Sequence, residues 1–395
     1  MPATERWLLP AGVEEILPPR AWQLDALRRR LLDLYWSWGY DLMFPPFIEY
    51  LESLLTGTAN DLELQTFKVM DQMSGRLMGI RADMTPQAAR IDAHVLQRES
   101  PVRLCYLGSV LRARPEGVST SRSPLQVGAE IFGHEGAASD TEVVALMLET
   151  LKAAGLQGVT LDLGHVGVYR QIVAQAELAQ ETERELFEIL RRKAVPEFHE
   201  ALAQSDLEPS VRERLSALIE LHGGAEVLEQ TRTRLADKIP GVGAALERIE
   251  TVADFVARRY PEVQLHFDLG ELHSYHYENG LVFAAFRDGE GQALARGGRY
   301  DGIGEAFGRA RPATGFSADL KRLMPHDGDR RGRSGTGIFA PATEDPALEE
   351  AILRLRRQGE RVVRALPGDG TTAVDYSCDR QLVQDSDGWT VRPSD

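Results

Sequence analysis

A long, almost wholly helical segment divides the strand-like parts of this sequence. From about Tyr169 to Tyr260 the chain is rich in Ala, Leu, Glu and Arg and has few β-branched runs, a composition typical of helices. Strand-like segments occur on both sides of it, at Val102–Ala113, Val127–Phe132, Val159–Leu163, Val263–Leu269, Leu281–Phe286 and Gln292–Ala295. Because the strand pattern resumes after the helices, we expect one α+β domain, residues 1–325, interrupted by a helical insertion at residues 169–260.

Local signals place the other elements of this domain. Helical periodicity predicts an amphipathic helix from Pro19 to Trp38, and two short strands, Phe67–Asp71 and Arg76–Arg81, predict a hairpin. Further helices are expected after Thr85, taken as an N-cap, and near Phe316–Leu323. Two capping boxes, Ser139 with Glu142 and Ser210 with Glu213, predict two more helix starts.

The C-terminal part reads as a separate, short domain. Residues 326–334 are mostly Gly, Asp and Arg, which is typical of a solvated linker, and we interpret Arg330, Arg331 and Arg333 in that way rather than as a nucleic-acid patch. Residues 335–395 then begin with a β-α-β pattern, formed by Ile338–Ala340, Ala347–Arg357 and Val362–Leu366. We expect a short α/β domain here.

Charge and cysteine content exclude several classes of function. Lys and Arg total 45 against 60 Asp and Glu, and the resulting net charge of −15 disfavours partners held through their phosphates. Cys105 and Cys378 are far apart in sequence, which makes a disulfide framework or a cysteine-based zinc site an unlikely reading. No apolar run is long enough to span a membrane and no signal peptide is recognisable, so we expect a cytoplasmic protein.

A glycine-rich stretch from Gly297 to Gly304 is the most informative local motif. The glycines at 302, 304 and 308 do not have the spacing of a dinucleotide-binding loop, because the last comes one residue too late. On composition alone, the stretch predicts a tight turn between two elements.

Taken with other motifs, this stretch resembles a known family, the histidyl-tRNA synthetases and their class II relatives. The resemblance runs through about the first 325 residues and rests on four ordered segments: Leu9–Pro18, Pro46–Glu49 (motif 1), Val110–Arg112 with Gln126–Gly133 (motif 2), and Gly297–Gly302 with Gly315–Phe316 and Leu320–Leu323 (motif 3). It implies an antiparallel sheet with flanking helices and a two-fold interface at motif 1.

The resemblance also implies a pocket for L-histidine. Asp83 and Thr85 lie where the family accepts hydrogens from the ligand ammonium, Gln126 where it binds the amino end, and Glu130 where it contacts the imidazole, with Tyr277 also in the pocket. From the residues alone, Asp83 and Thr85 are equally well explained as helix caps.

Three positions depart from the family on the ATP side. His273 replaces an arginine that acts on the amino-acid carboxylate, Arg114 replaces a glutamate, and Asp319 replaces a glycine next to adenine. Arg112 and Arg322 are retained and could still contact an anion. These departures put adenylate formation in doubt.

The histidine pair His273 and His276 does not predict a metal site. His273 and His276 are three residues apart, so on a strand they would point to opposite faces and could not chelate one ion together. We expect neither a metal nor a cofactor.

An intact amino-acid side, an altered ATP side and an abbreviated C-terminal domain together resemble the regulatory subunits of ATP phosphoribosyltransferase. The resemblance implies a non-catalytic partner of a short-form catalytic subunit in the first step of L-histidine synthesis. It also implies a homodimer through motif 1, L-histidine as a ligand, and no tRNA. A functional histidyl-tRNA synthetase and a free-standing histidine sensor remain alternatives.

Overall fold

The computed structural model describes residues 7–56, 60–115, 121–176, 178–272, 278–324, 337–368, 370–386 and 388–394. Its contacts divide the chain into two compact units, residues 1–15 with 28–325 and residues 16–27 with 326–395. The proposed linker, residues 326–334, lies outside the described residues.

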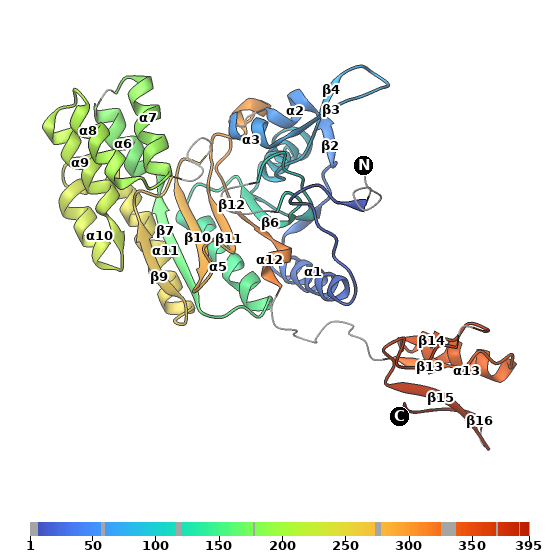
Figure 1. Ribbon diagram of the computed structural model, residues 1–395. Helices are drawn as coiled ribbons and strands as arrows, with labels where there is room; N and C mark the ends of the chain where they lie inside the picture. Colours follow the sequence, from blue (N-terminus) through green and yellow to red (C-terminus); the bar gives the residue numbers. More distant parts are fainter. Residues whose placement is uncertain are drawn as a thin grey trace. The chain divides into compact units, whose positions relative to one another are not determined.

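The first unit is built on a mixed sheet that runs across most of its width (Figure 1). In the described part of the chain this sheet has nine strands, in the order β1-β5-β6-β12-β11-β10-β7-β9-β8. The strands are β1 Asp41–Met43, β5 Val102–Ser109, β6 Leu125–Phe132, β7 Val159–His165, β8 His222–Gly223, β9 Gln264–Asp268, β10 Leu281–Arg287, β11 Ala295–Arg299 and β12 Ala313–Asp319. The five strands from β5 to β10 in this order pair antiparallel, as expected from the resemblance.

A smaller sheet, β2-β4-β3, holds the predicted hairpin. Its strands are β2 Ile48–Tyr50, β3 Phe67–Met70 and β4 Leu77–Ile80, and β3 pairs antiparallel with β4. The hairpin prediction is therefore confirmed.

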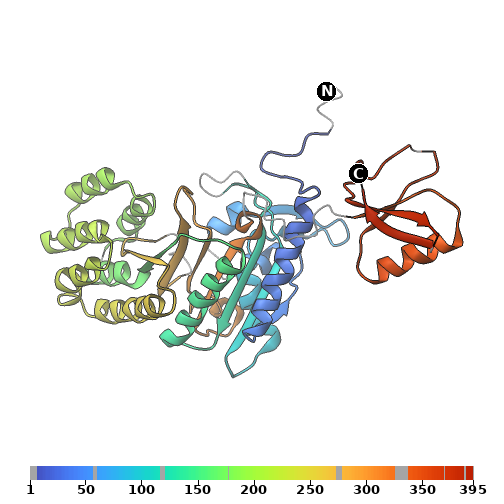
Figure 2. The same cartoon turned by 90° about the horizontal axis from the view of Figure 1, so that it is seen from below.

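Helices cover the sheet and gather at its β7–β9 end (Figure 2). They are α1 Arg20–Ser37, α2 Leu51–Leu55, α3 Asn60–Gln65, α4 Thr85–Arg90 continued by a π-helical turn Ile91–Leu96, α5 Ala137–Ala153, α6 Val166–Ala176, α7 Gln180–Arg191, α8 Val195–Gln204, α9 Pro209–Glu220, α10 Glu226–Thr231 continued by a π-helical turn Arg232–Ala236, α11 Val242–Arg259, and α12 Leu320–Leu323. A 3₁₀ turn spans Glu305–Phe307. Helix α5 packs on β12, β6 and β11, and α11 packs on α5 and β7.

The C-terminal residues form a four-stranded sheet, β14-β13-β15-β16, with one helix against it. The elements are β13 Ile338–Ala340, α13 Pro346–Arg357, β14 Val362–Arg364, β15 Arg380–Asp385 and β16 Gly388–Pro393. Buried Ile338, Leu348, Ile352 and Leu382 belong to its core. The predicted β-α-β pattern is confirmed, and the hairpin of β15 and β16 was not anticipated.

Both predicted capping boxes are wrong. Helix α5 begins at Ala137, so Ser139 lies inside its first turn, where its hydroxyl donates to the carbonyl of Gly136 at 2.9 Å. Glu142 binds Arg103 instead of a backbone amide. Helix α9 has no capping bond from a side chain. Thr85 is likewise the first helical residue rather than the N-cap.

The turn predicted for the glycine-rich stretch is confirmed at residues 301–304, between β11 and β12, but Gly297 and Gly298 lie within strand β11. The helix predicted near Phe316–Leu323 begins only at Leu320, because Phe316 lies within strand β12. The glycines are needed where they are, because a Cβ atom at Gly297 would lie 2.6 Å from the Phe283 ring. The strand predicted at Val102–Ala113 ends at Ser109.

Candidate functional site

The site lies on one face of the large sheet, where glycines leave room for carboxylates. A row of paired positions crosses five strands: Gly164, Val282, Gly298, Gly315 and Glu130. A Cβ atom at Gly298 would lie 2.5 Å from Oε1 of Glu278, and one at Gly315 would be much nearer still to Oε2 of Glu130. Strands β11 and β12 therefore have glycine at the positions where two acidic groups occupy the sheet face.

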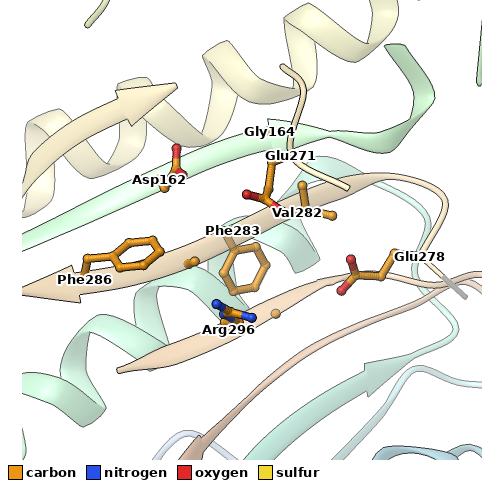
Figure 3. Close-up of a pocket in the computed structure, with 10 residues that line it drawn as sticks. Asp162, Gly164, Glu271, Glu278, Val282, Phe283, Phe286 and Arg296 are labelled. Atoms are coloured by element: carbon orange, nitrogen blue, oxygen red, sulfur yellow. The ribbon is translucent and has the colours of Figure 1, made fainter. Parts of the chain in front are cut away.

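Two adjoining pockets open on this face. One, of about 270 Å³, is lined by the acidic groups Asp83, Glu130 and Glu278 together with Thr85, Arg296 and Tyr300. The other, of about 410 Å³, is lined by Asp162, Glu271, Glu278, Phe283, Phe286 and Arg296 (Figure 3). We call them the β6 pocket and the β7 pocket. Glu278, Arg296 and Gly297 belong to both.

Glu130 is the most enclosed acidic group of the β6 pocket. Its Oε1 accepts hydrogen bonds from the Tyr106 hydroxyl at 2.8 Å and from Thr85 Oγ1 at 3.2 Å, and its Oε2 accepts one from the Tyr300 hydroxyl. Burial raises the pKa of Glu130 to about 8, against the lowering effect of these hydrogen bonds. Glu130 is therefore a carboxyl that a cationic ligand would ionise.

Asp83 is held in place by Gln126. The Gln126 side chain donates from Nε2 to Oδ1 of Asp83 at 2.7 Å and accepts the Met84 amide at 2.9 Å on its Oε1. Asp83 Oδ1 also accepts the Thr85 amide at 3.1 Å, but the N-cap position of α4 is Met84 and the helix has no side-chain capping bond. Asp83 therefore makes a local bond before the helix and also lines the pocket.

The structure brings together four of the five pocket residues expected from the resemblance: Asp83, Thr85, Gln126 and Glu130. The fifth, Tyr277, lies outside the described residues, as does His273. Sequence reasoning missed Tyr106, Tyr300, Glu278 and Arg296. Arg296 and Tyr300 are near or inside motif 3, but their direction toward the pocket depends on strand register, which the motif alone does not give.

On the side expected to hold ATP, the side chains of Asp319 and Arg322 are hydrogen-bonded to the protein's own backbone. Asp319 Oδ1 accepts the amides of Leu125 and Lys321 at 3.0 and 3.1 Å, and burial raises the pKa of its carboxyl. The Arg322 guanidinium donates to the carbonyls of Ala293 and Gln292 at 2.8 and 3.2 Å. Arg112 pairs its backbone with Arg122, and Arg114 is exposed.

An acidic cluster beside the β7 pocket has its own partners. Oxygens of Asp162, Asp268 and Glu271 lie within 4.8 Å of one another. Lys193 Nζ lies 2.6 Å from Asp268, and His266 Nδ1 lies 2.9 Å from Asp162. These contacts explain the cluster without a metal ion.

Among the described residues, no helix has both the length and the apolar character needed to cross a membrane.

The sequence matches two described families. Residues 12–323 match the family described as Histidyl-tRNA synthetase, and residues 335–392 match the ATP phosphoribosyltransferase subunit HisZ C-terminal domain. The chain is 56% identical to the ATP phosphoribosyltransferase regulatory subunit of Thioalkalivibrio sulfidiphilus over 392 residues, 99% of each chain. It is 55% identical to the subunit of the same name from Pseudomonas aeruginosa over 394 residues, 100% of this chain and 99% of the relative.

Solved structures agree with these matches. A Bacillus halodurans protein described as an ATP phosphoribosyltransferase regulatory subunit/histidyl-tRNA synthetase superposes with a TM-score of 0.80 at 28% identity, covering 93% of this chain and 95% of that one. A histidyl-tRNA synthetase from Nostoc shares the fold, with a TM-score of 0.78 at 17% identity over 98% of this chain and 94% of that one. The resemblance stated from the motifs is confirmed, and the chain belongs to the family of ATP phosphoribosyltransferase regulatory subunits.

Proposed function

We propose that this regulatory subunit activates a short-form ATP phosphoribosyltransferase catalytic subunit and binds L-histidine, the product of the pathway, in the β6 pocket. One observation carries the proposal: the acceptors for an amino acid are assembled and hydrogen-bonded, while Asp319 and Arg322 on the ATP side bind the protein's own backbone. A pocket of this kind can sense histidine but lacks the means to activate it.

The chemistry of the β6 pocket fits histidine. The ammonium group needs charged or polar acceptors, which Asp83 and Thr85 provide at the start of α4. The imidazole needs an acceptor for a ring N–H, and Glu130 provides one deeper in the same pocket. Tyr106 and Tyr300 fix the Glu130 carboxylate in place, so little reorganisation is needed on binding.

The loss of aminoacylation follows from the ATP side. A carboxylate at Asp319 replaces a glycine of the synthetases, and its two backbone hydrogen bonds keep it in that place. Arg322 would have to give up two carbonyl partners before it could bind a phosphate. Both features oppose the precise placement of ATP that adenylate formation requires.

We further propose a homodimer through motif 1. Apolar side chains around this motif are exposed in the single chain, with Phe44 at 76%, Phe47 at 44% and Ile48 at 37%. A two-fold interface would cover them, since large apolar groups gathered on a surface mark interaction sites.

Reconstitution tests the proposed function. The full-length chain is mixed with a short-form catalytic subunit, and formation of phosphoribosyl-ATP is followed with and without L-histidine. Activation of the catalytic subunit and inhibition of the complex by histidine are expected. A catalytic subunit whose rate is unaffected by this chain would contradict the proposal.

A further inference from the structure

Arg296 is the one positively charged side chain among the described residues that line the two pockets. The same lining holds five carboxylates: Asp83, Glu130, Asp162, Glu271 and Glu278. Beside Arg296 a ligand carboxylate would meet a positive charge, whereas beside any of the five acidic groups it would find no charge attraction. The cation therefore sets where an anionic group can bind.

Other arginines near the site are committed to partners within the protein. Arg81 donates to the carbonyls of Ser109 and Pro45, Arg299 pairs with Asp140, and Arg322 donates to two carbonyls. Arg296, in contrast, makes no hydrogen bond and no ion pair with any described residue. Within the described part of the chain, no group competes with a ligand for its guanidinium donors.

Strand register places Arg296 over the sheet face. On β11 it pairs with Ala284 of β10 and with Ser317 of β12, two small residues that leave space around its side chain. Gly298, two residues further along β11, points to the same face and has no side chain to block the way to Glu130. Figure 3 shows the Arg296 guanidinium and the Glu278 carboxylate among the side chains that line one pocket.

Glu278 lines both pockets together with Arg296. It is 5% exposed and its carboxylate makes no hydrogen bond with a described residue. Burial, with repulsion from Glu271 and Glu130, raises the pKa of Glu278 well above its ordinary value, while Arg296 acts in the other direction. Arg296 and Glu278 make no ion pair with each other, so the guanidinium can bind a ligand anion while the Glu278 carboxyl, whose pKa is raised, offers a hydrogen-bonding group in the same pockets.

We propose that Arg296 binds the α-carboxylate of the amino acid held in the β6 pocket and makes the pocket selective for a zwitterion over a simple amine. The inference rests on the proposed function, which places histidine there. In the sequence, His273 takes the place of the synthetase arginine that acts on the carboxylate. Arg296 supplies a permanent cation from strand β11, and so provides recognition of the carboxylate without restoring catalysis.

Calorimetry with two ligands tests the inference on the full-length chain. L-histidine and histamine share the ammonium and the imidazole, and only histidine has the carboxylate. Wild-type protein is expected to bind histidine more tightly. Arg296→Met removes the charge-assisted hydrogen bonds to the carboxylate, so histidine affinity should fall about ten- to hundredfold. Histamine affinity should be retained or rise, because the variant lacks the positive charge of Arg296, which repels the histamine ammonium.

Controls separate recognition from folding. Arg309→Met removes an arginine that pairs with exposed Glu99, away from the pockets, and should leave both affinities unchanged. Arg296→Lys should keep part of the preference for histidine. Histamine binding by Arg296→Met shows that its pocket is still folded.

The outcomes are distinct. An unchanged histidine affinity in Arg296→Met, or an equal loss for both ligands, would overturn the role of Arg296 and leave the histidine pocket standing. Absence of histidine binding in the wild-type protein would overturn the proposed pocket and this inference with it, while activation of the catalytic subunit would still be measurable.

Discussion

Gly315 and Glu130 lie directly opposite each other on the antiparallel strands β12 and β6, and the Glu130 carboxylate occupies the space that a side chain at 315 would take. The contact explains why a glycine stands in the middle of a buried strand, where it would otherwise weaken the sheet. It also ties motif 3 to motif 2 through one residue pair.

Gly315→Ala should therefore abolish histidine binding. The added methyl group would contact the Glu130 carboxylate and the backbone carbonyl of Ala129. Because the carbonyl cannot move aside, the carboxylate would be forced away from Tyr300 and Thr85. We expect no measurable heat of histidine binding and a lower melting temperature. Gly302→Ala is the matched control, since a Cβ atom there meets nothing within 4 Å. Normal histidine affinity in Gly315→Ala would contradict the geometry described for this pair.

Glu130 should make the stability of the unliganded protein fall as pH rises. Its pKa is about 8 in the folded chain against an ordinary value of 4.5, so the folded state binds more protons between these values. The unfolding free energy should then decrease from about pH 4.5 to 8, by at most about 1.4 kcal/mol per pH unit for this group. Urea unfolding at several pH values, compared with Glu130→Gln, isolates the contribution. A variant with the same pH slope as the wild type would show that Glu130 ionises normally.

Motif 3 also contains an arginine whose role is structural. Arg299 donates to Asp140 of α5 within 2.8 to 3.3 Å, and the two side chains are only 3% and 0% exposed. Arg299→Met should lower the unfolding free energy by about 1 to 3 kcal/mol, because it removes hydrogen bonds to a buried carboxylate, which keeps Arg248 as a charged partner at 2.8 Å. The exposed pair of Arg192 and Glu197 serves as the comparison. Glu197→Ala should lower the unfolding free energy by less than about 1 kcal/mol. Equal costs in denaturant unfolding would refute the structural assignment.

How far the sequence predicts this structure depends on whether a signal is local. The hairpin of β3 and β4, the helix from Arg20 and the acceptors Asp83 and Glu130 follow from short patterns or motifs. Gly297 and Gly298 were read as a turn because glycine disfavours strands, and only their neighbours across the sheet explain why they are needed.

The rest of the site could not be predicted for the same reason. Arg296 and Tyr300 reach the pocket because of the register between β10, β11 and β12, which no single segment specifies. Ser139 fits the sequence pattern of an N-cap, but in the structure it takes part in a tertiary contact: the Arg299 guanidinium donates to its hydroxyl at 2.8 Å. Local chemistry gives candidate residues, and long-range pairing decides which of them meet.

The altered ATP side should prevent amino-acid activation. Purified protein is expected to give no histidine-dependent exchange of pyrophosphate into ATP. Asp319→Gly should not restore exchange, since Arg322 remains bound to carbonyls, and it should lower stability by about 1 to 3 kcal/mol through the loss of acceptors for two amides. A radiolabel exchange assay with a histidyl-tRNA synthetase as positive control checks this, and exchange at the synthetase's rate would refute the non-catalytic assignment.

The proposed dimer should depend on motif 1. Phe47 is 44% exposed in the single chain, and its ring lies 5.5 Å from the guanidinium carbon of Arg81. Phe47→Asp would place a charge in the apolar interface, so self-association should weaken, and activation of the catalytic subunit should fall with it because a symmetric dimer engages two partner sites at once. Val195→Asp, a change at a position 40% exposed on α8, is the matched control and should leave both properties intact. Light scattering at micromolar concentration distinguishes the cases: a monomeric wild type would refute the interface, and a monomeric Phe47→Asp that still activates fully would refute its link to function.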